Sequence, residues 1–319
     1  NGATAHVPSL KKQNHKQRNH SKQMKKEIKN AASTAESAKK KVVVAFSGGL
    51  DTSFTVMYLA REKGYEVYAA CADTGGFSKE QLRKNEANAY QLGAKAYVTL
   101  DVTKEYYEKS LKYMIFGNVL RNGTYPVSVS SERIFQGMAI ARYANEIGAQ
   151  AIAHGSTGAG NDQVRFDMTF LVICPDIEII TLTRDMNLTR QFEIDYLNKN
   201  GFKADFKKLK YSYNTGIWGT SICGGEILDP AQGLPETAYL KQVEKTGSEL
   251  LKIEFKKGEI IAVNGKKYTG WGTASLLSEK ETNLILLCYA DSEYYSSCSQ
   301  FIFSTLNSLA IGNIGLRTP

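Results

Sequence analysis

A buried strand that leads directly into a double-glycine turn is the feature that most restricts how this chain can fold. Residues 42–46 form a short β-branched run, Val-Val-Val-Ala-Phe, which is typical of a strand covered on both faces. Gly48 and Gly49 end that run, and apolar residues with helical spacing begin just after Asp51. A buried strand followed at once by a helix predicts the first unit of a parallel α/β sheet.

The same alternation of strand and helix recurs along the chain. We expect further strands at 66–72, 96–100, 150–154 and 177–182, and helices at 51–63, 78–93, 103–116 and 134–147. Ser78 and Gln81 have the spacing of a capping box at the start of the second of these helices. The alternation predicts a doubly wound α/β fold, with helices on both faces of a parallel sheet. A ligand should then bind beyond the carboxyl ends of the strands.

The loop at 47–53, Ser-Gly-Gly-Leu-Asp-Thr-Ser, lies between the first strand and its helix. A helix N-terminus favours an anion, because backbone N–H groups and the helix dipole point toward it. The glycines let phosphate oxygens approach the backbone, and the hydroxyl side chains add donors. The spacing is not that of a Walker loop, and no Lys follows the glycines. The loop predicts a site for nucleotide phosphates, with a capped glycine turn as the simpler alternative.

A second glycine-rich loop follows the strand expected at 150–154. Residues 154–167 read His-Gly-Ser-Thr-Gly-Ala-Gly-Asn-Asp-Gln-Val-Arg-Phe-Asp. Such a loop brings an amide, a carboxylate and a guanidinium to one point. An amino-acid zwitterion needs those partners, a cation for its carboxylate and an anion for its ammonium. In isolation, Asp162 and Arg165 are better explained as an exposed ion pair.

Both loops resemble those of a known enzyme family. The first resembles the signature of the PP-loop (N-type) ATP pyrophosphatases, which cleave ATP between the α and β phosphates. The second closely resembles the HGATGKGNDQVRFE stretch of argininosuccinate synthases, with Ala159 in place of a Lys. The resemblance implies a Rossmann-like domain of the adenine nucleotide alpha hydrolase type, with a partial second α+β synthetase domain.

A third stretch, residues 125–133, resembles the YLLGTSLAR segment of the same family. It matches that segment at Tyr125, Ser130 and Arg133, and Val129 replaces a Thr. Ser212 and Ser221, nine residues apart, match two serines of the family's second domain. Without the other matches, this pair would be unremarkable loop residues.

The resemblance implies a role for individual residues. ATP would contact Ala45, Phe46, Ser47, Gly48, Gly49, Leu50, Asp51, Thr52, Ser53, Ala72 and Gly155. Aspartate would be held by Thr157, Asn161 and Asp162. Citrulline would contact Tyr125, Ser130, Asn161, Arg165, Ser212 and Ser221. Asp162 and Arg165 are the expected catalytic residues, while His154 is expected to be structural.

The reaction implied by the resemblance joins citrulline to aspartate at the expense of ATP. The citrulline oxygen attacks the α-phosphate, pyrophosphate leaves into the first loop with Mg²⁺, and citrullyl-AMP forms. The aspartate amine then displaces AMP. No protein nucleophile is needed, so positioning and electrostatics would supply most of the acceleration.

The net charge of +8 belongs to the start of the chain. Residues 1–40 contain ten Lys or Arg and two Asp or Glu, which leaves 30 basic and 30 acidic residues in the remainder. A neutral body gives no reason to expect a nucleic-acid surface. This argues against a tRNA-thiolating PP-loop enzyme, which would also need an activated cysteine.

Histidine and cysteine are too sparse for a metal centre. His154 is the single histidine after residue 40, and the five cysteines contain no CxxC pair. We therefore expect reduced thiols, no metal site and a cytoplasmic protein without membrane spans.

Four segments are expected: a disordered tail at 1–40, an ATP-binding domain at 41–205, a partial synthetase domain at 206–268 and a divergent segment at 269–319. The last shows no counterpart of the family's later Glu and Tyr contacts to citrulline. This leaves open a catalytically impaired binding protein, and it makes the family's homotetramer doubtful for this chain.

Overall fold

The computed structural model describes residues 39–117, 119, 121, 127–158, 160–203, 211–224, 226, 229, 231–239, 252–257 and 259–267. The expectations for the tail, for Tyr125 and for 269–319 lie outside these residues.

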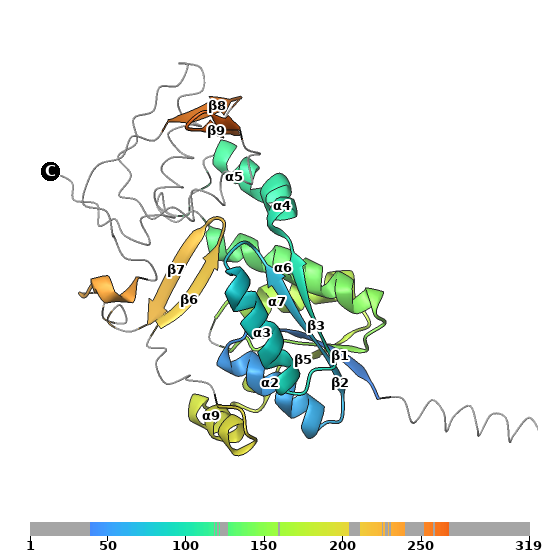
Figure 1. The fold of residues 1–319 in the computed structure, drawn as a ribbon. Coiled ribbons are helices and arrows are strands. Elements are labelled where there is room, and N and C mark those ends of the chain that lie inside the picture. Colours follow the sequence, from blue (N-terminus) through green and yellow to red (C-terminus); the bar gives the residue numbers. More distant parts are fainter. Residues whose placement is uncertain are drawn as a thin grey trace, which may run out of the picture. The chain divides into compact units, whose positions relative to one another are not determined.

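The central sheet has five parallel strands in the order β3-β2-β1-β4-β5 (Figure 1). They are β1 (Lys41–Ala45), β2 (Glu66–Asp73), β3 (Ala96–Asp101), β4 (Ala151–Ala153) and β5 (Glu178–Ile180). The chain builds outward from β1 to β3, then crosses back to add β4 on the other side of β1. The predicted parallel α/β sheet is confirmed, and its topological switch point lies between β1 and β4.

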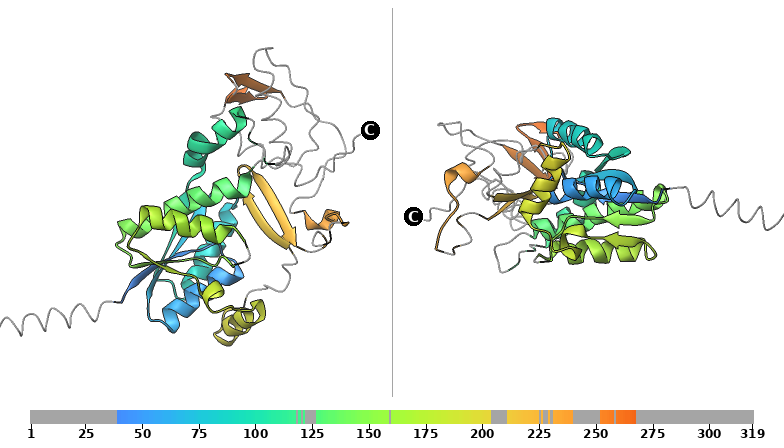
Figure 2. Two further views of the ribbon diagram at one scale, coloured as in Figure 1. Left: turned by 180° about the vertical axis from the view of Figure 1, so that it is seen from behind. Right: turned by 90° about the horizontal axis from the view of Figure 1, so that it is seen from below.

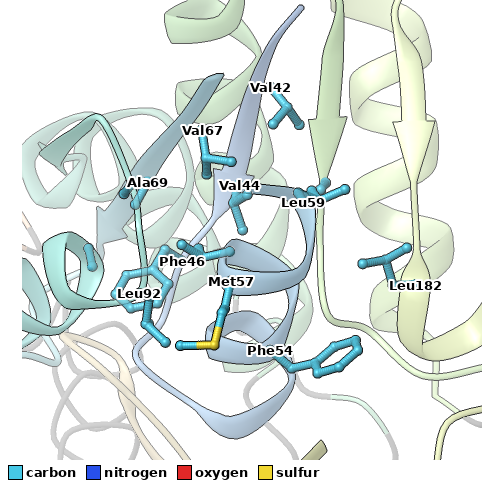
Figure 3. Close-up of a cluster of buried hydrophobic side chains, with 14 of the residues drawn as sticks. Val42, Val44, Phe46, Phe54, Met57, Leu59, Val67, Ala69, Leu92 and Leu182 are labelled. Atoms are coloured by element: carbon cyan, nitrogen blue, oxygen red, sulfur yellow. The ribbon is translucent and has the colours of Figure 1, made fainter. Parts of the chain in front are cut away.

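Helices cover both faces of this sheet, because alternate residues of each strand point to opposite sides. Val42 and Val44 pack in one core cluster with α2 (Leu50–Arg61), α3 (Lys79–Gln91) and α9 (Arg190–Lys199). Figure 3 shows side chains of this cluster from β1, β2 and α2, together with Leu92, which follows α3. Val43 packs in a second cluster with α6 (Ser128–Glu146) and α7 (Asp162–Ile173), which the reversed view of Figure 2 shows in front of the sheet.

The remaining elements build a smaller core beside the carboxyl edge of the sheet. α4 (Thr103–Tyr106), a π-helical turn (Tyr107–Leu111) and α5 (Lys112–Phe116) form the helical stretch expected at 103–116. The hairpin of β6 (Tyr211–Gly216) and β7 (Gly219–Gly224) packs on it through Ile217 and Trp218. An antiparallel sheet of β8 (Ile253–Lys256), β9 (Glu259–Val263) and β10 (Lys266–Lys267) joins the same cluster through Val263, and a 3-10 turn spans Glu236–Ala238.

Two predicted boundaries were wrong. The helix expected from residue 134 begins at Ser128, and the hydroxyls of Ser130 and Ser131 in its first turn donate to the carbonyl of Val127. The strand expected at 177–182 ends at Ile180, and Leu182 opens the short helix α8 (Leu182–Asp185). Among the described residues, no helix combines the length and apolar character that crossing a membrane requires.

Candidate functional site

The two glycine-rich loops meet at the switch point of the sheet. One follows β1 and the other follows β4, which is its neighbour. A Cβ atom added to Gly155 would lie 2.9 Å from Cβ of Asp51 and 3.2 Å from the backbone nitrogen of Thr52. The second loop therefore rests against the first turn of α2, and only glycine allows this approach.

The first loop folds tightly around its own backbone. Gly48 has φ +77°, and a Cβ atom there would lie 2.2 Å from Oδ1 of Asn85 in α3. The Asn85 amide donates to the carbonyl of Ser47 at 3.4 Å, which ties the loop to α3. The N–H of Gly49 donates to the Ser47 hydroxyl at 3.4 Å. Sequence reasoning missed Asn85, which has no motif around it.

The hydroxyl groups of this loop differ in their environment. Oγ of Ser47 and Oγ1 of Thr52 lie 3.4 Å apart. Ser53 is 1% exposed, and its Oγ has no hydrogen-bond partner among the described residues. A buried donor without a protein acceptor at the start of a helix suits an anion such as phosphate.

Several residues expected to contact ATP have their side chains in the hydrophobic core. Phe46 and Leu50 belong to the cluster between β1 and α2, and Ala72 belongs to the cluster under α6. Because the side chains of Phe46 and Leu50 pack in the core, these residues would contact a nucleotide through their backbone atoms.

A network around His154 supports the second loop. His154 is buried, its Nε2 lies 2.8 Å from Oδ1 of Asp167, and the N–H of Ser156 donates to its Nδ1. Nδ1 is thus an acceptor, so the proton is on Nε2. Burial lowers the pKa of His154, against the effect of Asp167. With both ring nitrogens engaged, the geometry supports the structural role expected for His154.

The same network continues to the loop backbone. Arg184 donates to the other oxygen of Asp167 at 2.8 Å and to Oε1 of Gln163 at 3.0 Å. Burial alone would raise the pKa of Asp167, but the hydrogen bonds from Arg184 and His154 lower it. Gln163 donates to the carbonyls of Gly158 and Gly160 at 2.7 and 3.2 Å. These hydrogen bonds within the protein therefore shape the loop.

Asp162, the first residue of α7, is held between two arginines. Nε of Arg133 lies 2.9 Å from Oδ2 of Asp162, and Nη1 of Arg165 lies 2.7 Å from Oδ1. Arg133 also donates to Gln136 at 2.8 Å and to Oδ1 of Asn214 in β6. Arg133 thus links α6, α7 and the hairpin, a role that its place in the 125–133 match did not reveal.

The residues expected to contact aspartate and citrulline are only partly located. Thr157 and Asn161 are exposed on the second loop, next to Asp162. The hydroxyl of Ser130 is used within the protein, as a donor to Val127. In the hairpin, Asn214 pairs with Ser221 and lies two residues from Ser212, so these three positions share one face. The side chains of both serines and the whole of Tyr125 lie outside the described part of the chain.

A buried carboxyl group lies under the hairpin. A Cβ atom at Gly216 would be 2.0 Å from Oε1 of Glu132, and that oxygen has no partner among the described residues. Burial raises the pKa of Glu132 to about 8, although nearby Arg133 opposes the shift. The sequence could have drawn attention to Glu132, because a Glu stands there in place of the Ala of the YLLGTSLAR pattern. The described residues contain no group of three or more His, Cys, Asp or Glu side chains that could hold a metal ion.

A parallel sheet with two glycine loops in contact at its switch point defines an α/β nucleotide-binding domain. The family model that matches residues 41–203 is that of the argininosuccinate synthase N-terminal HUP domain. The chain therefore belongs to the argininosuccinate synthase family.

Curated members of the family support this assignment. The argininosuccinate synthase of Pyrobaculum aerophilum is 37% identical over 242 residues, which is 75% of this chain and 60% of the relative. That of Methanocaldococcus jannaschii is 38% identical over 228 residues, 70% of this chain and 57% of the relative. That of Lactococcus lactis subsp. cremoris is 38% identical over 233 residues, 71% and 58%. The aligned part is thus about 60% of each relative's length.

Proposed function

We propose that this chain carries the ATP-dependent ligation of citrulline and aspartate to argininosuccinate, through a citrullyl-AMP intermediate, with release of AMP and pyrophosphate. The observation that carries the proposal is the contact of Gly155 with Asp51 and Thr52. It brings the phosphate loop and the loop that leads to Asp162 to one edge of the sheet. The α-phosphate and the reacting groups of the amino acids would then lie close together at this edge of the sheet.

The first loop would bind the triphosphate of ATP. Its donors are the N–H groups at the start of α2 and the hydroxyls of Ser47, Thr52 and Ser53, and the Ser53 hydroxyl has no acceptor in the part of the chain that the structure describes. Mg²⁺ would enter with ATP as part of the substrate, bound to phosphate oxygens. Pyrophosphate would remain in this loop after the adenylyl group is transferred to the ureido oxygen.

The second loop and α7 would bind the amino acids. Thr157, Asn161 and Asp162 would hold aspartate, whose ammonium group needs an anion. Asn161 and Arg165 would hold citrulline, with Ser130, Ser212, Ser221 and Tyr125. Because Asp162 is already paired with Arg133 and Arg165, the ammonium must share this carboxylate with two guanidinium groups.

The acceleration would come from positioning and electrostatics. Cys71 and Cys174 are buried, and burial raises the pKa of both thiols, so neither suits a nucleophile. His154 uses both ring nitrogens inside the protein.

Citrulline-dependent exchange between ATP and labelled pyrophosphate tests the proposal. Exchange should occur, and Asp51→Ala or Gly49→Val should abolish it while the circular dichroism spectrum is unchanged. Asp195→Ala removes an exposed carboxylate on α9 and should leave exchange intact. ATP binding without exchange would instead support a nucleotide- and amino-acid-binding protein that is catalytically impaired. Near wild-type exchange by Asp51→Ala would refute the loop assignment.

A further inference from the structure

A second buried carboxyl group, outside both loops, lies against the first turn of α2. Glu193 of α9 is 1% exposed. The hydroxyl of Thr183 donates to its Oε1 at 3.1 Å, while Oε2 is buried and has no donor among the described residues. The carboxyl group of Asp51 lies within hydrogen-bonding reach of Glu193. Two acceptor groups therefore face each other at the loop proposed to bind phosphate.

Core packing fixes this arrangement. The rings of Phe54 in α2 and Tyr196 in α9 are 5.1 Å apart, and those of Phe54 and Phe192 are 6.1 Å apart. Asp51 lies one turn before Phe54, and Glu193 lies one turn before Tyr196, so each acid shares a face with its ring. The two carboxyl groups are thus brought together by the interface between α2 and α9.

Two facing carboxyl groups form a hydrogen bond only if one of them carries a proton. Asp51 lies in the first turn of α2, where the helix dipole favours a carboxylate. Glu193 is buried, and burial together with the neighbouring Asp51 raises its pKa to about 8, against the effects of Thr183 and of Arg190 on the same helix. At neutral pH the proton is therefore on Glu193, and its O–H donates to Asp51.

We propose that Glu193 is a positioning residue of the nucleotide site, whose neutral carboxyl group donates a hydrogen bond to Asp51 and holds it where the loop receives the phosphates of ATP. The inference rests on the proposed function in one respect, that this loop binds ATP. It does not depend on citrulline, aspartate or ligation.

Ionisation of Glu193 has two effects on the loop. It removes the hydrogen bond to Asp51, and it adds a second buried negative charge beside the site for an anion. Both effects disfavour a polyphosphate, so ATP affinity should fall as the pH rises through the value at which Glu193 loses its proton.

Calorimetric titration with MgATP from pH 7.0 to 9.5 tests this without any catalytic step. For the wild-type chain, the dissociation constant should increase above pH 8 by up to about tenfold per pH unit. Glu193→Gln should bind with an affinity that is independent of pH in this range, because its amide donates to Asp51 at every pH. Thr183→Val removes a hydrogen bond that favours the ionised form, so it should move the midpoint of the pH profile upward.

Glu62→Gln is the matched control. Glu62 follows the other end of α2 and accepts from the Tyr196 hydroxyl at 2.9 Å, so the variant makes the same chemical change at the same helix pair, away from the loop. It should keep the wild-type pH profile. A pH-independent wild type, or equal slopes for wild type and Glu193→Gln, would overturn the inference and leave ATP binding standing. If Glu193→Gln fails to fold, an unshifted profile for Thr183→Val overturns it as well. A chain that binds no ATP at any pH overturns the proposed function and this inference together.

Discussion

Arg133 should contribute more to stability than Arg142, the other arginine of α6, because its guanidinium joins three elements. It contacts Asp162 of α7 at 2.9 Å, Gln136 at 2.8 Å and Asn214 of β6, and its side chain is 15% exposed. A hydrogen bond to a charged group contributes roughly 1.5–3 kcal/mol. Asp162 is 32% exposed and keeps Arg165 as a partner, which limits the loss. We expect Arg133→Met, which retains the apolar stem, to lower the free energy of unfolding by about 2–3 kcal/mol.

Arg142→Met is the control for this prediction. Arg142 lies on the same helix and bonds both oxygens of Glu105, at 2.9 and 3.2 Å, but its side chain is 48% exposed. An exposed pair contributes about 0–1 kcal/mol. In thermal unfolding, Arg133→Met should melt about 5–10 °C below wild type and Arg142→Met within a few degrees of it. Equal melting temperatures for the two variants would refute the view that Arg133 holds the hairpin to the sheet domain.

Three further outcomes are expected. Gly48→Ala forces a side chain into φ +77° and against Asn85, so it should cost at least about 1–2 kcal/mol. Adding Asn85→Ala to Gly48→Ala should restore only the part of the lost stability that comes from the clash with Asn85, not the part that comes from the strained backbone. If the double variant is as stable as Asn85→Ala alone, this prediction is wrong. The folded-state pKa of His154 lies below its unfolded value, so its contribution to stability is present above about pH 6.5 and is lost as the pH falls. The melting temperature of the wild-type chain should therefore fall between pH 7 and pH 5, and that of His154→Gln should fall less. Equal decreases for the two proteins would refute a contribution from His154. Asp162→Ala should weaken the use of aspartate more than tenfold, a cost of roughly 2–5 kcal/mol, while citrulline-dependent pyrophosphate exchange persists. An equal loss of aspartate use and of citrulline-dependent exchange would show that Asp162 does not act on aspartate alone.

The parallel sheet could be predicted because its signals are local. A β-branched strand such as β1, the glycines after it and the capping box of Ser78 and Gln81 each act within a few residues. The structure confirms the capping box, with both of its reciprocal hydrogen bonds. The start of α6 was predicted too late, because its serine-rich first turn carries no apolar periodicity.

The glycine loops could also be predicted, but the residues that support them could not. Asn85, Asp167, Arg184 and Asn214 act across separations of 17 to 81 residues, and no spacing rule connects them to their partners. Glu193 shows the limit most clearly. In the sequence, Glu193 looks like any other polar residue of a helix. Only the packing of α9 on α2 brings its carboxyl group to Asp51.

The position of β4 beside β1 has a consequence for how this chain folds. Val42 pairs with Ala151, and the segment between them contains two complete strand–helix units. Contacts that close so long a loop form slowly, because the chain loses entropy before the contacts compensate for it. Gly155 reaches Asp51 only after that closure, so the nucleotide loop is completed late, when the sheet already has its final order. A ligand that binds only the completed loop would stabilise the native state by mass action and slow its unfolding. Folding intermediates of this chain should therefore not bind the nucleotide, and refolding rates should be the same with and without it.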